Sequence, residues 1–184
     1  MQRAHTAVGH VVWINGAFGS GKSTAAQLLV DSVPGAALID PEEIGSLLRT
    51  TLQPIAPVRD FQQWRAWRSL VATMLNSVVR ELPKDGPRLV VVPQTITDQA
   101  YWLEIISSLD PGIRLTAVAL HVGPDEHRRR TVEDSNEPGA VRWRLAGFER
   151  FRSASWVHTS FAGIETSTLS PADVAEAVRA LSTR

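Results

Sequence analysis

The fold of this chain is decided by the stretch INGAFGSGKST, which runs from Ile14 to Thr24. Residues 16–23 match the pattern G-x-x-x-x-G-K-[ST], in which glycines let successive backbone N–H groups turn inward toward phosphate oxygens. An apolar run, Val11–Ile14, precedes the pattern, and helical periodicity follows it from about Lys22 to Val33. A glycine-rich turn between a strand and a helix N-terminus is the setting that this motif requires. The stretch therefore predicts a phosphate-binding loop that serves a nucleoside triphosphate.

Each residue type in the predicted loop suits the binding of ATP and Mg²⁺. Lys22 would place a positive charge beside the β- and γ-phosphates, and the Ser23 hydroxyl would ligate Mg²⁺. Lysine is otherwise scarce, since Lys84 is the only other one in the chain. We expect the nucleotide to contact Gly16, Ala17, Phe18, Gly19, Ser20, Gly21, Lys22, Ser23 and Thr24.

The rest of the chain alternates short β-rich apolar runs with longer segments of helical period, which is typical of α/β proteins with a parallel sheet. We expect further strands at Ala36–Ile39, Leu89–Val92, Leu115–Val122 and near Ile164. We expect helices after Asp40, from Phe61 to Leu82, from Asp98 to about Leu109, and at His127–Val132, Val141–Ser153 and Pro171–Leu181. A length of 184 residues, with no internal repeat, predicts one domain that spans residues 1–184.

The composition excludes several classes of protein. No cysteine is present, which excludes a disulfide scaffold, a thiolate zinc site and a cysteine nucleophile. Basic and acidic side chains number 19 each, and this balance argues against a nucleic-acid partner. No run of about 18 apolar residues occurs, and Val11–Ile14 is too short for the apolar part of a signal peptide. We therefore expect a cytoplasmic protein without a transmembrane segment, and the sequence leaves peripheral membrane contact open.

An acidic residue follows the second expected strand, within IDPEE at residues 39–43. In small-molecule kinases with such a loop, this position faces the γ-phosphate, where a carboxylate can accept a hydroxyl proton or hold Mg²⁺. Asp40 is equally a helix N-cap, with Glu43 completing a capping box. The two roles are compatible, because ligands bind at the same carboxyl edge of the sheet. We assign Asp40 to catalysis and, together with Ser23, to Mg²⁺.

The acceptor side of the cleft is expected in a helical region at about residues 46–84. Arginines alternate with tryptophans there, a combination that suits a planar, anionic or sugar-bearing ligand, although tryptophans at this spacing also fit a core. The third strand ends in Pro93 and Gln94 instead of the aspartate that commonly holds Mg²⁺, and polar groups follow it. The candidate acceptor-binding residues are Trp64, Arg65, Arg68, Gln94 and Thr95.

Arginines gather after the fourth expected strand, at residues 128–130, and again at Arg142 and Arg144. Small kinases carry arginines on a mobile lid, where they offset the charge of the phosphoryl group in transfer. A solvated basic helix face, with Glu126 pairing Arg130 at i,i+4, is the alternative. We expect at least one arginine to serve the phosphates, and a lid at about residues 133–144.

Taken together, these motifs resemble the bacterial tunicamycin-resistance proteins, a branch of the P-loop kinase superfamily. The matching segments are INGAFGSGKST at Ile14–Thr24, LIDPEEIG at Leu38–Gly45, VVVPQTIT at Val90–Thr97 and HVGPDEHRRR at His121–Arg130. The resemblance implies a three-layer P-loop NTPase fold like that of nucleoside monophosphate kinases, with a parallel sheet of five strands in the order 2-3-1-4-5. It also implies Arg130 as a lid residue that acts in catalysis beside Lys22 and Asp40.

Three functions follow from this resemblance and from the motifs. The first is transfer of the ATP γ-phosphate to a hydroxyl of tunicamycin, which would make the antibiotic a small-molecule substrate. The second is a non-catalytic protein that sequesters the drug and needs ATP to do so. The third is a kinase of a small metabolite, such as a sugar acid or a nucleotide. An ATPase switch acting on a protein partner is disfavoured, because no switch segment is identifiable in so short a chain.

Overall fold

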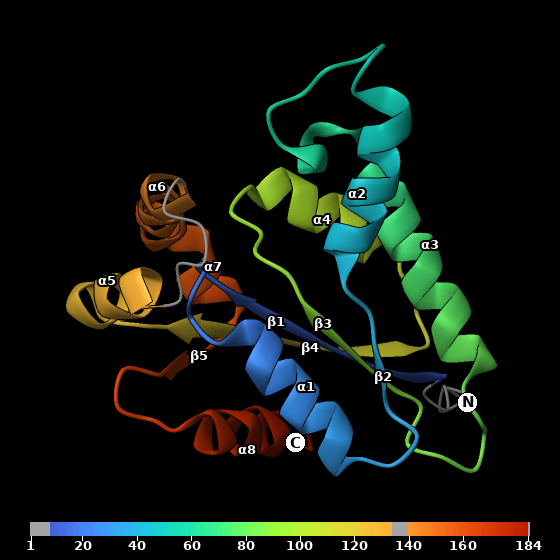
Figure 1. Cartoon of the computed structure of the whole chain (residues 1–184). Coiled ribbons are helices and arrows are strands. Elements are labelled where there is room, and N and C mark those ends of the chain that lie inside the picture. Colours follow the sequence, from blue (N-terminus) through green and yellow to red (C-terminus); the bar gives the residue numbers. More distant parts are fainter. Residues whose placement is uncertain (1–7, 134–139, 184) are drawn as a thin grey trace.

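The computed structural model describes residues 8–133 and 140–183, and Figure 1 traces the chain. Its sheet has five parallel strands in the order β2-β3-β1-β4-β5. The strands are β1 (Gly9–Gly16), β2 (Ala37–Leu38), β3 (Leu89–Pro93), β4 (Ile113–His121) and β5 (Ala162–Glu165). The strand order expected from the family resemblance is thereby confirmed.

Helices cover both faces of this sheet. They are α1 (Lys22–Ser32), α2 (Pro41–Leu52), α3 (Arg65–Glu81), α4 (Gln99–Ser107), α5 (Pro124–Glu133), α6 (Ala140–Ser153), α7 (Ser155–Ser160) and α8 (Pro171–Ser182). Helices α1 and α8 pack on one face, and α3, α4 and α7 pack on the other (Figure 1). The expected three-layer P-loop NTPase fold is therefore confirmed.

Strand β1 forms the centre of the core, because all eight of its residues are buried. Val11 and Trp13 pack with the layer that contains α3 and α4, whereas Val12 and Ile14 pack with α1 and α8. Successive side chains of a strand point to opposite faces, so a strand covered on both sides carries apolar residues in succession, as Val11–Ile14 do here. This packing on both faces fixes where β1 ends, and thus where the glycine-rich loop begins.

The long helix expected from Phe61 to Leu82 is two separate elements, so that expectation is wrong. A short 3₁₀ helix, Phe61–Gln63, comes first, because Asp60 forms a capping box with its last residue. The backbone of Trp64 is extended, with φ −70° and ψ 121°, and α3 begins at the next residue. The apolar periodicity continues across this break, which is why the sequence pattern did not reveal it.

The loops that follow β1, β3, β4 and β5 leave from one carboxyl edge of the sheet, where α/β proteins of this kind bind ligands. The lid expected at about residues 133–144 is described only in part. Glu133 ends α5 and Ala140 begins α6, but residues 134–139 lie outside the described residues. Within the two described ranges, no helix combines the length and the apolar character needed to cross a membrane.

Candidate active site

The glycine-rich loop connects β1 to the N-terminus of α1. Gly21 is the N-cap of α1 and has φ 93°, a left-handed conformation that favours glycine. Its carbonyl accepts the first helical hydrogen bond from the Ala25 N–H at 2.9 Å. The N–H groups at the start of α1 have no partner within the helix, and they make its N-terminus attractive to anions. The local backbone therefore has the form that the sequence motif predicts.

Two polar side chains form hydrogen bonds between the start of this loop and the segment that follows β3. The Asn15 side chain is fully buried, and its Oδ1 accepts from the N–H groups of Gly16 and Ile96, each at 2.9 Å. The Thr95 hydroxyl donates to the Gly16 carbonyl at 2.6 Å. Thr95 thus supports the loop, where the sequence analysis expected it to bind an acceptor. Asn15 was missed, because nothing in a sequence indicates a partner about eighty residues away.

Lys22 lies with its ammonium group folded over the loop. Its Nζ donates to the Ala17 carbonyl at 2.9 Å. Burial lowers the pKa of Lys22 to about 8, although Glu42 and Asp40 act in the opposite direction. A buried cation with a depressed pKa gains strongly from a nearby anion, because burial disfavours its charged form. Lys22 is therefore prepared for a polyanionic ligand such as a phosphate chain.

A hollow of about 200 Å³ brings the loop together with the start of α2. Its lining residues are Phe18, Gly19, Gly21, Lys22, Ser23, Thr24, Asp40, Glu42 and Pro93. Asp40 caps α2 by accepting from the Glu42 backbone N–H at 2.9 Å, and among the described residues no capping box with Glu43 accompanies this cap. Burial, followed by the adjacent Asp40, raises the pKa of Glu42. Two carboxylates thus share one hollow with a lysine, and the sequence analysis assigned a role to only one of them.

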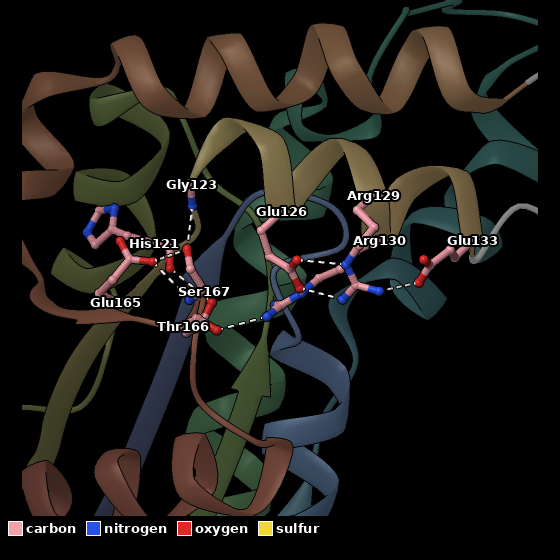
Figure 2. Close-up of polar contacts among 9 residues, drawn as sticks. All are labelled: His121, Gly123, Glu126, Arg129, Arg130, Glu133, Glu165, Thr166 and Ser167. Carbon is pink, nitrogen blue, oxygen red and sulfur yellow. Dashed lines mark hydrogen bonds and ion pairs between the residues drawn. The ribbon is translucent and has the colours of Figure 1, made fainter.

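A larger hollow, of about 570 Å³, lies on the other side of the loop. Gly19, Gly21 and Thr24 line both hollows, so the loop separates them. Arg129 and Arg130 of α5 face this second hollow, as the prediction of arginines near the phosphates requires. Both donate to Glu126, and Arg130 also donates to the Thr166 carbonyl at 2.8 Å (Figure 2).

The segment after β5 is hydrogen-bonded to the end of β4. These bonds fix the side of the larger hollow that Ser167 lines. The N–H and the hydroxyl of Thr166 both donate to the His121 carbonyl, at 2.7 and 2.9 Å. The Ser167 hydroxyl donates to Glu165 and accepts from the Gly123 N–H at 2.7 Å (Figure 2). The Thr166 carbonyl that receives Arg130 is therefore fixed in position.

Helix α6 packs against the phosphate-binding loop through side chains of its first turns. The Arg144 guanidinium lies 3.9 Å from the centre of the Phe18 ring, and the exposed Trp143 contacts the same ring edge-on at 6.2 Å. These contacts connect the segment of the predicted lid that is described, residues 140–144, directly to the phosphate-binding loop. Neither aromatic contact was foreseen from the sequence.

The expected acceptor residues line neither of these two hollows, although Trp64 lines a third one, of about 250 Å³, together with Arg49 and Arg59. Arg68 is buried, where it pairs with Glu104 at 2.6 Å and stacks on Tyr101. Trp64 is only 6% exposed, and the Gln94 side chain is 2% exposed and donates to the Thr95 carbonyl. The side chain of Arg65 extends outward, with 90% exposure. Most of these residues are thus used in contacts within the protein, and their binding of an acceptor stays a prediction.

Comparison with known proteins identifies the family. The sequence profile of an AAA domain matches residues 11–153, which run from β1 to the end of α6. The chain belongs to the AAA domain family. The matched part of this AAA domain contains the loop, Asp40, Glu42 and the α5 arginines. No curated protein sequence matches the chain significantly.

Solved structures show which kind of AAA domain the chain resembles. The tunicamycin resistance protein of Deinococcus radiodurans is 28% identical, with a TM-score of 0.66 over 92% of this chain and 93% of that one. Shikimate kinase from Acinetobacter baumannii is 18% identical, with a TM-score of 0.63 and coverages of 97% and 94%. The APS kinase of Mycobacterium tuberculosis is 20% identical, with a TM-score of 0.56 and coverages of 96% and 98%. This AAA domain is a P-loop kinase-like protein, and its resemblance to the tunicamycin-resistance family is confirmed.

Proposed function

We propose that the protein is an ATP-dependent phosphotransferase that moves the γ-phosphate to a hydroxyl of a small molecule, with a tunicamycin-like nucleoside antibiotic as the acceptor. One observation carries the proposal: Lys22, Asp40 and Glu42 converge on a single hollow at the start of α1. The identity of the acceptor is supported by the D. radiodurans relative, which is a tunicamycin resistance protein. ATP as the donor would place the reaction in the cytoplasm, and the balanced charge favours no nucleic-acid partner.

The described residues fit ATP and Mg²⁺. The two hollows meet at the loop, so a nucleoside in the larger one would extend its phosphates across the loop toward Lys22. A structure of the related APS kinase is a complex with the ATP analogue AMPPNP, which supports this donor. Ser23 and Asp40 line the smaller hollow and would hold Mg²⁺. The metal ion would offset the negative charge that develops on the phosphates.

The chain's own side chains then account for the transfer. The acceptor oxygen attacks the γ-phosphorus, the bond from that phosphorus to the β,γ-bridging oxygen breaks, and ADP leaves. A carboxylate, Asp40 in our assignment, accepts the proton that the acceptor hydroxyl loses. Lys22 stabilises charge on the β- and γ-phosphates, and Arg130 contributes from the larger hollow once a phosphate replaces one of its present partners.

Kinases of small metabolites give a second candidate function. The related structures include shikimate kinase and a gluconokinase, and these support the fold but not a particular acceptor. A drug-sequestering protein is a third candidate, because Gln94 stands where a Mg²⁺-binding aspartate is common and its side chain is buried. Each candidate predicts a different result in one assay.

The assay measures ADP release from ATP and Mg²⁺ with tunicamycin, gluconate, shikimate or a nucleoside monophosphate as acceptor. The proposal predicts ADP release that depends on tunicamycin, together with a product heavier by one phosphoryl group in mass spectrometry. Release with a metabolite alone would support the second function. Tight tunicamycin binding that requires ATP but yields no ADP would support sequestration.

ATP binding should take up a proton above about pH 8. Lys22 in the free protein has a pKa of about 8, and bound phosphates raise it because they favour the charged ammonium. At pH 7 Lys22 is already charged, so uptake should be small, and by pH 9 it should approach one proton. The apparent affinity should therefore fall as the pH rises past 8, by up to about tenfold per pH unit. Titration calorimetry in buffers of different ionisation enthalpy measures the uptake, and equal uptake at the two pH values would contradict the role of Lys22.

A further inference from the structure

A buried histidine of α5 contacts the phosphate-binding loop. His127 has no exposed surface, and its Nε2 lies 2.8 Å from the Phe18 carbonyl oxygen. Because a carbonyl oxygen only accepts hydrogen bonds, Nε2 must carry the hydrogen and donate it. This bond joins two segments 109 residues apart in sequence. The spacing of the five histidines in the sequence indicates no metal site, so the sequence alone points to no role for His127.

The packing around His127 holds its ring in one orientation. The ring stacks on Phe148 of α6, with centroids 4.0 Å apart and planes inclined by 15°. Its other nitrogen, Nδ1, is buried and has no hydrogen-bond partner among the described residues. A neutral ring that donates through Nε2 leaves Nδ1 without a hydrogen, whereas a charged ring would bury an unpaired N–H there. Burial also lowers the pKa of His127, which agrees with the neutral form.

Gly19, the loop residue after Phe18, packs against the same face of α5 that carries His127. Thr131 lies one helical turn beyond His127, and both are fully buried. Gly19 has φ 76°, and a Cβ at that position would lie 3.6 Å from the Thr131 hydroxyl and 4.0 Å from the His127 ring. The loop is therefore seated on this helix through the Phe18 carbonyl, with Gly19 packed beside it.

Helix α5 presents its other face to the larger hollow, where Arg129 and Arg130 lie. The hydrogen bond from His127 consequently sets the position of the loop relative to these arginines. Its loss would leave the Phe18 carbonyl without its donor and would let the loop move away from the helix.

We propose that His127 is a positioning residue: by donating to the Phe18 carbonyl it holds the phosphate-binding loop in register with the α5 arginines, ready to receive phosphates. The inference rests on the proposed function only in taking ATP as the ligand. His127 acts through the loop and touches no reacting atom.

The test compares two substitutions that separate the hydrogen bond from the packing. His127→Phe keeps a ring to stack on Phe148 but removes the donor. His127→Gln restores an N–H near the place of Nε2 but loses the ring. His158→Phe is the control, because His158 is exposed and lines neither hollow. The readouts are the dissociation constant for ATP by calorimetry, and hydrogen exchange of the amides at residues 16–21 without ligand.

His127→Phe should weaken ATP binding about tenfold and speed exchange of the loop amides by a similar factor, while its melting temperature falls only by the effect of one lost hydrogen bond. His127→Gln should bind ATP within about threefold of the wild type, and the control should be unchanged. Wild-type ATP affinity and loop exchange in His127→Phe would overturn the proposal. If the wild type binds no ATP, the proposed function fails, and the loop exchange alone decides about His127.

A measurement on the wild type covers the case in which His127→Phe does not fold. In protein labelled with ¹⁵N at histidine, the ring of His127 should show a neutral form with its proton on Nε2, and that proton should exchange slowly with water. A proton on Nδ1, or rapid exchange at Nε2, would overturn the proposal without any variant.

Discussion

Replacing Lys22 with alanine should weaken ATP binding by about 100-fold or more and leave the fold intact. Lys22 is the only charged residue of the loop, and a hydrogen bond between charged partners contributes about 1.5–3 kcal/mol, with the attraction between the charges adding to it. Among the described residues, its Nζ donates only to the Ala17 carbonyl. Its depressed pKa means that the charged form opposes folding, so its removal should not lower the melting temperature.

Lys84→Ala is the matched control, since Lys84 is the only other lysine and lies exposed in the turn after α3. It should bind ATP as the wild type does. Calorimetry with both variants measures the difference directly. ATP affinity of Lys22→Ala within twofold of the wild type would show that the loop does not bind the nucleotide through this side chain.

Replacing Asp40 with asparagine should lower turnover by about 10²–10⁴-fold, the usual range for a general base. The amide keeps the size of the carboxylate but loses its charge, so it cannot serve as a base and would hold Mg²⁺ more weakly. It can still accept from the Glu42 N–H as an N-cap, so stability should change little. Asp40→Ala should in addition lose about 0.5–2 kcal/mol of folding free energy, because the cap is then absent.

Acceptor-dependent ADP release and thermal melting on both variants separate the two roles. If Asp40 is only a cap, Asp40→Ala melts earlier while Asp40→Asn turns over normally, and the catalytic assignment is wrong. Glu42→Gln belongs in the same series, because Glu42 shares the hollow and its pKa is raised. A larger effect of Glu42→Gln than of Asp40→Asn would assign proton acceptance to Glu42.

Local patterns in the sequence were sufficient for most of the fold. The strand–loop–helix unit around Gly21 follows from short-range rules: an apolar run, a glycine that tolerates positive φ, and a helix start. The order of the strands came from the resemblance, which the structure confirms. The six residues of α7 were missed, because so short a helix shows less than two periods of any pattern.

Residues of the candidate site could be predicted from the sequence only where they belong to one local motif. Lys22, Ser23 and Asp40 lie in or beside motifs, and the structure places them around one hollow. Asn15 and His127 support the loop through partners about eighty and 109 residues away, and no local pattern encodes such contacts. The present partners of Arg68 were hidden for the same reason, since Glu104 and Tyr101, which engage its charge, belong to another helix.

The pairing of Arg129 and Arg130 with Glu126 has a consequence for which anions the protein retains. The two guanidinium groups hold the pKa of Glu126 well below its usual range, so this carboxylate keeps its charge under all physiological conditions. It therefore competes with every anion that enters the larger hollow. Chloride offers no more charge than Glu126 already supplies and sulfate or a single phosphate at most one charge more, whereas a triphosphate offers more and, in the proposed function, would also meet Lys22. Under the proposed function, this resident carboxylate would make the two arginines favour a ligand with several phosphates over a small anion of single charge.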